Sequence, residues 1–191
     1  MSSTNRGGNV VSPDYYVTPI EPIRTFLREL VKLEPHVLTG RVLDSAAGGD
    51  QVRPMSYPEA LKSLGVKDSQ ITTVDMRSDS RAQVKSDYLK WVPEKEFDLV
   101  ISNPPFCLAR EFIEKGWKDC VDRGFVIMLL RLNFFGSQKR QSFWQGNMPK
   151  YSFVHSNRMS FTPDGKTDSI EYMHCVWENG YYPDYTMTRV I

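Results

Sequence analysis

The chain has 191 residues, of which 40% are hydrophobic and 12% aromatic, and its formal net charge is +1. This apolar content is enough for the core of one domain. The near-neutral charge neither requires nor excludes a nucleic-acid partner, because a local basic face can coexist with it. No apolar run approaches the roughly 20 residues that span a bilayer, so we expect no membrane partner.

Cysteine and histidine usage argues against a metal site or a disulfide scaffold. The three cysteines, Cys107, Cys120 and Cys175, form no CxxC pair, and an odd number cannot all pair within one chain. The three histidines are scattered and show no ligand spacing. We therefore expect reduced thiols, an intracellular location and no bound metal.

The predicted elements alternate between strands and helices. Residues 1–13 are small and polar, lack the apolar core of a signal peptide and are expected to be disordered, which leaves 14–191 as a single domain. Apolar residues spaced three and four apart predict helices, and short apolar or alternating runs predict strands. In chain order the sequence predicts helix 22–33, strand then loop 40–50, helix 58–66, strand 70–76, short strand or turn 83–91, strand 96–103, helix 107–120, strand 124–132, short helix or lid 137–145, and antiparallel strands 151–161 and 169–179.

This order predicts an α/β fold, in which a doubly wound, mostly parallel sheet of seven strands ends in a C-terminal antiparallel hairpin at its edge. The architecture is Rossmann-like, and ligands of such sheets bind at the carboxyl ends of the strands. The polar residues that end the predicted strands should therefore lie together in one site; they are Asp44, Asp75, Asp87 and Asn103.

Two strand ends suggest where a nucleoside could bind. The segment 44–49, DSAAGG, has small residues that let the backbone pass close to a ligand, although ordinary tight turns also use glycine and alanine. Asp75 ends the second strand, where a carboxylate suits the two hydroxyls of a ribose. A helix N-cap is the alternative role of Asp75.

The segment KSDYL adds a possible contact to an adenine ring. Asp87 could accept a hydrogen bond from the adenine amino group while Tyr88 or Leu89 packs on the ring, and the alternative is a solvated loop acid. The chain has no GxGxxG motif, and no phosphate-binding lysine follows 44–49. Nucleoside-binding features without a pyrophosphate clamp favour S-adenosylmethionine, which carries adenine and ribose but no phosphate.

The motif Asn103-Pro104-Pro105-Phe106 ends the third clear strand. The amide oxygen of Asn103 is an uncharged acceptor, and Pro105 holds Pro104 extended so that the Pro104 carbonyl can face the same pocket. Two acceptors that converge on one amino group bind both of its hydrogens and localise its lone pair, which can then attack an electrophilic methyl group. Phe106 offers a face to a planar substrate. The alternative is a proline-rich strand end with an aromatic core residue.

The sequences NPPF at 103–106 and DSAAGG at 44–49, with Asp75 between them, resemble the class I S-adenosylmethionine-dependent amino-methyltransferases. In that family (D/N/S)PP(Y/F/W) marks enzymes that methylate a planar nitrogen. Longer segments resemble the small phage and prophage DNA adenine-N6 methyltransferases, at 14–23, 103–113, 129–140 and 159–177. The resemblance covers roughly residues 14–178. It implies methyl transfer from S-adenosylmethionine to N6 of a flipped-out adenine in duplex DNA, in the cytoplasm of a bacterium or of a phage-infected host.

The resemblance also implies a role for each matched residue. Asn103, Pro104, Pro105 and Phe106 would grip the target base, with Asp75 on the cofactor ribose and Asp87 on the cofactor adenine. The full set of cofactor-binding residues would be Tyr16, Thr18, Asp44, Ser45, Ala46, Gly48, Asp75, Asp87 and Tyr88. The family pattern places a glycine two residues after Gly48, where this chain has Asp50 after Gly49. We therefore expect a remodelled loop or a reduced cofactor affinity.

Candidate contacts with the DNA backbone are basic residues, each of which could equally be ordinary surface charge: Arg131, Lys139, Arg140, Arg158 and Lys166. The chain is too short for a large target-recognition domain, so recognition would depend on loops 135–150 and 162–168. RNA and protein-glutamine methyltransferases share the NPPF motif, and a degenerate subunit that only binds nucleic acid or a partner is a further alternative. The sequence leaves the recognition site and the oligomeric state open.

Overall fold

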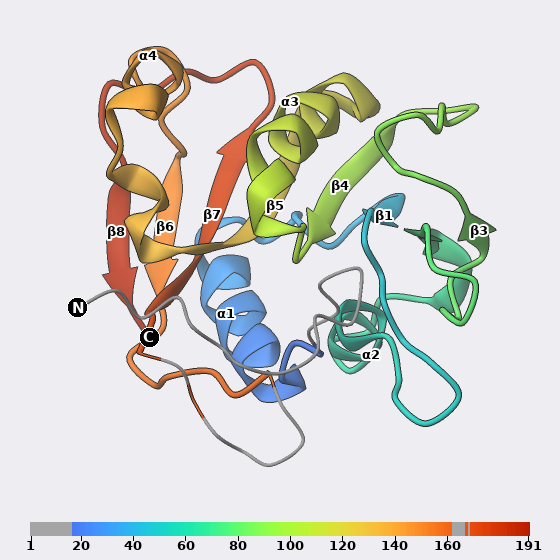
Figure 1. The fold of residues 1–191 in the computed structure, drawn as a ribbon. Coiled ribbons are helices and arrows are strands. Elements are labelled where there is room, and N and C mark those ends of the chain that lie inside the picture. The colour runs from blue at the N-terminus through green and yellow to red at the C-terminus, as the bar shows by residue number, and fades with distance from the viewer. Residues whose placement is uncertain (1–16, 162–166, 168) are drawn as a thin grey trace.

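The computed structural model describes residues 17–161, 167 and 169–191, which form one eight-stranded sheet flanked by helices (Figure 1). The strands are β1 (Val42–Asp44), β2 (Ile71–Asp75), β3 (Val84–Lys85), β4 (Phe97–Ser102), β5 (Cys120–Arg131), β6 (Tyr151–Val154), β7 (Tyr172–Glu178) and β8 (Met187–Val190). The α-helices are α1 (Ile20–Leu33), α2 (Ser56–Lys62), α3 (Ala109–Asp119) and α4 (Gln141–Trp144). Short 3-10 turns are η1 (Asp68–Gln70), η2 (Phe106–Leu108), η3 (Leu132–Phe135) and η4 (Gln138–Arg140). The disorder expected over 1–13 falls outside the described residues.

The strand order is β3-β2-β1-β4-β5-β7-β6-β8. Strands β1 to β5 pair in parallel, whereas β7 is antiparallel to both β5 and β6. The predicted α/β class, with a mostly parallel sheet and C-terminal antiparallel strands, is confirmed. Because β1 and β4 lie at the centre of the parallel part, their carboxyl ends meet at one edge of the sheet.

One detail of the predicted sheet is wrong. The sheet has an eighth strand, since β8 pairs in parallel with β6. The predicted antiparallel pair is present as β6–β7, with β7 next to β5, and β8 rather than this pair forms the edge. Burial gives the physical reason: every side chain of β7 is buried, which suits an interior strand, and every side chain of β8 is exposed, which suits an edge.

Helices cover both faces of the sheet. Leu99, Ile101 and Ile127 pack with α1 and α2 in one buried cluster, whereas their neighbours Val100 and Val126 pack with α3 in another. This alternation follows from the strand period of two residues. The apolar stripe predicted for the first helix is buried at Ile23, Phe26, Leu27 and Leu30, and Val31 is partly buried.

A chain of hydrogen-bonded rings lies in the α1–α2 side of the core. The Tyr57 hydroxyl is 2.9 Å from His174 Nε2, and His174 Nδ1 is 2.8 Å from His155 Nε2. Burial lowers the pKa of His155 to about 4 and that of His174 well below its usual value, so both rings are neutral. The two histidines are therefore not scattered, because neighbouring strands bring them together.

Within the described residues, no three histidine, cysteine or acidic side chains gather as a metal site. All three cysteines have unpaired thiols, two of them buried. In the same part of the chain, no helix has both the length and the apolar character needed to cross a bilayer.

Replacing Phe26 tests the core on the α1 side. Its fully buried ring stacks on His174 with 4.0 Å between ring centroids and packs edge-on against Phe153. Phe26→Ala should lower the free energy of unfolding by about 3–5 kcal/mol, because it removes a buried ring and leaves a cavity. Urea denaturation measures this loss. Val52→Ala is the control, since Val52 is 88% exposed and should change stability by less than about 0.5 kcal/mol. Equal stabilities of the two variants would contradict this packing.

Candidate functional site

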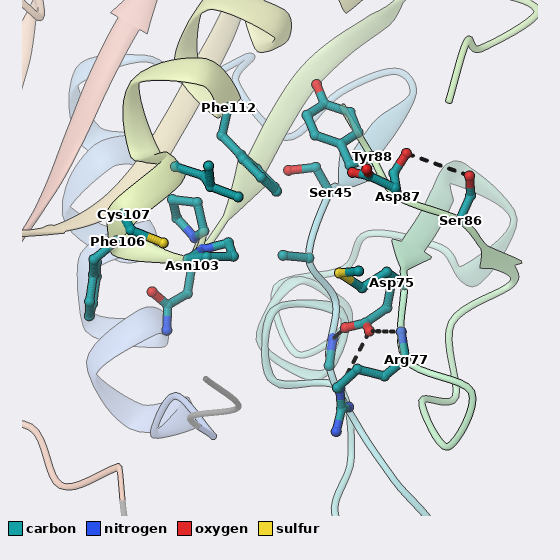
Figure 2. A pocket seen from close by; sticks show the side chains of 16 residues that line it. Ser45, Asp75, Arg77, Ser86, Asp87, Tyr88, Asn103, Phe106, Cys107 and Phe112 are labelled. Atoms are coloured by element: carbon teal, nitrogen blue, oxygen red, sulfur yellow. Dashed lines mark hydrogen bonds and ion pairs between the residues drawn. The ribbon is translucent and has the colours of Figure 1, made fainter. Parts of the chain in front are cut away.

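A cavity of about 240 Å³ lies where β1, β2 and β4 end (Figure 2). Its walls come from four segments that are far apart in sequence and meet at the carboxyl edge of the sheet. The lining residues are Ser45, Ala46, Gly48, Asp75, Met76, Arg77, Ser86, Asp87, Tyr88, Asn103, Pro104, Pro105, Phe106, Cys107, Leu108 and Phe112. The expectation that strand ends converge on one site therefore agrees with the positions of Asp75, Asp87 and Asn103.

The loop after β1 is fastened to the end of β2. Gly48 and Gly49 both have positive φ angles, 65° and 71°, which favour glycine at these two positions. The amide of Gly48 donates to Asp75 Oδ2 over 2.8 Å, and the Arg77 guanidinium donates to the Gly49 carbonyl over 2.8 Å. Arg77 also pairs with Asp75, with 3.4 Å between Nε and Oδ1 (Figure 2). These contacts hold the loop and the Asp75 carboxylate in one arrangement.

Asp50 stabilises the turn that follows Gly49. Its Oδ1 accepts hydrogen bonds from the backbone amides of Val52 and Arg53, each over 2.8 Å. These bonds lower the pKa of Asp50 below its usual value. Asp50 does not line the cavity, because its carboxylate is held within the turn that it forms with Val52 and Arg53.

Asp44 lies beneath the loop and does not line the cavity. It is fully buried, and its Oδ1 accepts a hydrogen bond from the Ser102 hydroxyl over 2.9 Å. Burial raises the pKa of Asp44 to about 7, with a smaller opposing effect from the Ser102 hydrogen bond. In this structure Asp44 joins the ends of β1 and β4 rather than facing the cavity.

The β2–β3 side of the cavity combines an acid with apolar surfaces. The Asp87 carboxylate lies at this wall, where it accepts from the Leu89 amide over 3.1 Å and pairs with Lys90 over 3.4 Å. The ring of Tyr88 is buried and packs on Phe112 with 5.1 Å between centroids. Met76 is 63% exposed and borders the same space. This wall can bind a flat, partly polar group such as adenine.

The opposite wall is the NPPF motif at the end of β4. Asn103 Nδ2 donates to the Thr18 hydroxyl over 3.0 Å, and Thr18 is buried. Asn103 Oδ1 is also buried but has no hydrogen-bond partner in the described structure. The Pro105 carbonyl accepts from the Leu108 amide over 2.8 Å, where η2 begins. Asn103 therefore lines the cavity (Figure 2), and its amide carries one buried oxygen that is unpaired among the described residues.

Phe106 lies at the border between this wall and an aromatic group on β7. Its ring centroid is 5.8 Å from that of Tyr172 and 4.6 Å from the guanidinium carbon of Arg131. The Phe106 ring is therefore partly covered by a cation in this structure.

The other residues that were predicted to contact the DNA backbone differ in their surroundings. Arg140 donates to the carbonyls of Asn133, Phe134 and Gly136, so it stabilises the η3 turn. Lys139 is exposed, and Arg158 is 3.6 Å from Glu171. Lys166, like Tyr16 of the predicted cofactor site, lies outside the described residues.

Several lining residues were not predicted from the sequence: Met76, Arg77, Ser86, Cys107, Leu108 and Phe112. Three of them, Met76, Ser86 and Cys107, directly follow or precede a predicted residue, and Arg77 and Leu108 lie two residues away, so proximity in sequence was the available signal. Phe112 was predicted as core, and its position four residues after Leu108 places both on one side of a helical turn.

No protein-family profile and no curated protein matches the sequence. Solved structures do share the fold. A candidate class I S-adenosylmethionine-dependent methyltransferase from Listeria monocytogenes superposes with a TM-score of 0.63 at 16% identity, over 92% of this chain and 65% of that one. A candidate RNA methyltransferase from Pyrococcus horikoshii gives 0.62 at 17% identity, over 91% and 90%. The type IIG restriction endonuclease BpuSI gives 0.57 at 15% identity, over 88% of this chain and 26% of that one.

These likenesses show that the chain has the Rossmann-like fold found in class I methyltransferases. This chain spans less than two thirds of the Listeria protein and about a quarter of BpuSI. The shared fold therefore identifies an architecture and not a reaction or a substrate.

Asp44→Asn tests the burial of this carboxylate through its pH dependence. The folded pKa of about 7 lies above the unfolded value of 3.8, so ionised Asp44 destabilises the fold at high pH. The variant should therefore be more stable than the wild type at pH 8. Because one pKa unit corresponds to about 1.4 kcal/mol, the upper limit of the gain is about 4 kcal/mol.

The gain should develop between about pH 4 and pH 7 and stay constant above pH 7. Urea denaturation of both proteins across this range measures it. A gain that does not change between pH 4 and pH 8 would contradict a buried, ionisable Asp44.

Proposed function

We propose that this protein is an S-adenosylmethionine-dependent methyltransferase that acts on the exocyclic N6 of adenine in DNA. The observation that carries the proposal is the buried Oδ1 of Asn103, a residue that lines the cavity, because this oxygen has no hydrogen-bond donor among the described residues. An unpaired buried acceptor is costly unless a ligand satisfies it. A primary amine on a planar ring is the group that suits such an acceptor.

The residues around the cavity fit S-adenosylmethionine as the cofactor. Asp75 lines the cavity at the end of β2, and each of its oxygens accepts one backbone bond, which leaves lone pairs for ribose hydroxyls. Tyr88, Phe112 and Met76 offer apolar contact to adenine, with Asp87 at the same wall. The glycine loop at 48 lets the backbone approach the methionine part. When bound, this cofactor supplies a methyl group on a positively charged sulfur.

The NPPF motif would hold the target amine in line with that methyl group. Asn103 Oδ1 would accept one amine hydrogen, and the carbonyl of Pro104, which also lines the cavity, would accept the other. Binding both hydrogens localises the nitrogen lone pair, so no base has to remove a proton before methyl transfer. The extra proton can leave to solvent afterwards. Thr18 keeps the amide oxygen pointing at the amine by occupying Nδ2.

DNA is proposed as the substrate from the resemblance of 103–113, 129–140 and 159–177 to phage-type DNA adenine methyltransferases. The likeness to a restriction endonuclease is compatible with it, whereas the likeness to a candidate RNA methyltransferase supports RNA as the alternative. An adenine in a duplex must be flipped into the cavity, at a cost of a few kcal/mol. The protein-glutamine and degenerate alternatives make different predictions in the following experiment.

Incubation with radiolabelled S-adenosylmethionine and duplex DNA should give N6-methyladenine, detected by mass spectrometry of the digested product. Asn103→Ala should reduce the rate of label transfer to DNA by at least about 100-fold, because it removes an acceptor that acts on the reacting amine. Its affinity for the cofactor, measured by calorimetry, should stay close to that of the wild type.

Parallel reactions contain RNA or a glutamine-containing peptide in place of DNA. If label appears only in the RNA or only in the peptide, that molecule is the substrate and DNA is not. If the protein binds the cofactor but labels none of the three substrates, the result contradicts the proposed methyl transfer. If the wild type does not bind the cofactor, the degenerate subunit is favoured.

Thr18→Val tests the orientation of the amide. Valine has nearly the shape of threonine but cannot accept the Asn103 hydrogen bond, so the amide can rotate and present its NH2 to the substrate amine. We expect the turnover number to fall about 10-fold, which corresponds to about 1.4 kcal/mol, with cofactor affinity largely unchanged. Thr18→Ser keeps the hydroxyl and should retain the turnover number of the wild type. Thr25→Val, on the exposed side of α1, is the matched control and should also leave turnover unchanged. Equal losses in the serine and valine variants would show that Thr18 acts only by packing.

A further inference from the structure

Arg131 is a partly buried cation at the carboxyl edge of the sheet, and no described acidic residue forms an ion pair with it. It is the last residue of β5, which pairs with β4, and β4 leads directly into the NPPF motif. Its Nε is buried and has no hydrogen-bond partner, and in the part of the chain that the structure describes no carboxylate forms an ion pair with it. A buried donor of a charged group without an acceptor is unfavourable. The unpaired guanidinium therefore favours the binding of an anion.

Other arginines at this edge of the sheet are already bound to acceptors. Arg77 pairs with Asp75, Arg140 donates to three backbone carbonyls, and Arg158 lies near Glu171. Arg131 instead lies over the face of Phe106, with its guanidinium carbon 4.6 Å from the ring centroid. Stacking on an aromatic face fixes the plane of a guanidinium while leaving its N–H groups at the plane's edge.

We propose that Arg131 binds a phosphodiester of the strand that carries the target base. This inference rests on the proposed function. A planar guanidinium can donate two parallel hydrogen bonds to two oxygens of one phosphate. Phe106 lines the cavity, so a phosphate held by Arg131 would lie beside the nucleotide whose base enters it.

The position of Arg131 assigns it to the substrate rather than to the cofactor. The cofactor part of the cavity is built by the 45–48 loop, Asp75 and Asp87, and Arg131 does not line the cavity. S-adenosylmethionine carries no phosphate that this cation could bind. The inference therefore distinguishes a nucleic-acid strand from a glutamine side chain or an isolated base, neither of which has a phosphate.

The salt dependence of nucleic-acid binding tests this contact. Binding of a fluorescent adenine-containing duplex is followed by anisotropy between 50 and 200 mM salt, without cofactor. Each phosphate contact contributes about 0.9 to the slope of log affinity against log salt concentration for duplex DNA, and about 0.7 for a single strand. Arg131→Gln should flatten the slope by about one such contribution. Arg131→Met, which keeps apolar contact with Phe106, should do the same and replaces the glutamine variant if that protein is unstable.

Arg123→Gln is the matched control, because it removes the same charge from the same strand. Arg123 is 70% exposed, pairs with Glu178, and lies roughly 26 Å from Arg131 along β5 at about 3.3 Å per residue. Its slope should equal that of the wild type. Arg131→Lys keeps the charge and should retain the slope, with weaker binding because the planar stacking is lost.

The outcomes separate this inference from the proposed function. A flattened slope in Arg131→Gln without methylation of any substrate supports the phosphate contact and removes the methyltransferase proposal. Methylated DNA with an unchanged slope in both charge-removing variants overturns the phosphate contact alone. The same titration with an RNA hairpin distinguishes the two sources of phosphodiester, and failure to bind either nucleic acid overturns the inference.

Discussion

The proposed site depends on one hydrogen-bond acceptor, the side-chain oxygen of Asn103, which has no partner among the described residues. The oxygen is buried at the end of β4, while the nitrogen of the same amide donates to Thr18. A freely rotating amide would present either atom, and only the oxygen can accept hydrogens from an amine. Thr18, in the segment that precedes α1, therefore sets the orientation of an amide that lies 85 residues further along the chain. The proposed chemistry follows from this orientation.

The sheet places the remaining parts of the site around that oxygen. Parallel pairing of β1 with β2 and β4 brings the glycine loop, Asp75 and the NPPF motif to one edge. Asp75 and Arg77 hold the loop from one side, and Ser102 joins the buried Asp44 to the end of β4. Arg131 ends the adjacent strand β5, so the cation next to the amine site is also positioned by the sheet. A cofactor and a substrate can thus approach from neighbouring strand ends.

The sequence predicted the features that depend on local pattern. The apolar stripe of α1, the strands that end at Asp75 and Asn103, and the α/β class all follow from periodicity and turn residues. Contacts between distant segments were not predictable. These include the Thr18–Asn103 bond, the pairing of His155 with His174 and the insertion of β7 beside β5. Strand β8 has no buried side chain, so no hydrophobic pattern marked it. Asp44 and Asp75 both end strands of the parallel sheet, and only the structure shows that Asp75 lines the cavity whereas Asp44 is fully buried beneath it.

The most direct measurement is a crystal structure with a non-reactive cofactor analogue and a DNA duplex that contains adenine. We expect a flipped adenine whose N6 lies about 2.7–3.2 Å from Asn103 Oδ1, with Asn103 Nδ2 still bound to Thr18. An Asn103 oxygen that instead accepts from a protein group, with the adenine bound elsewhere or left in the duplex, would contradict the central claim.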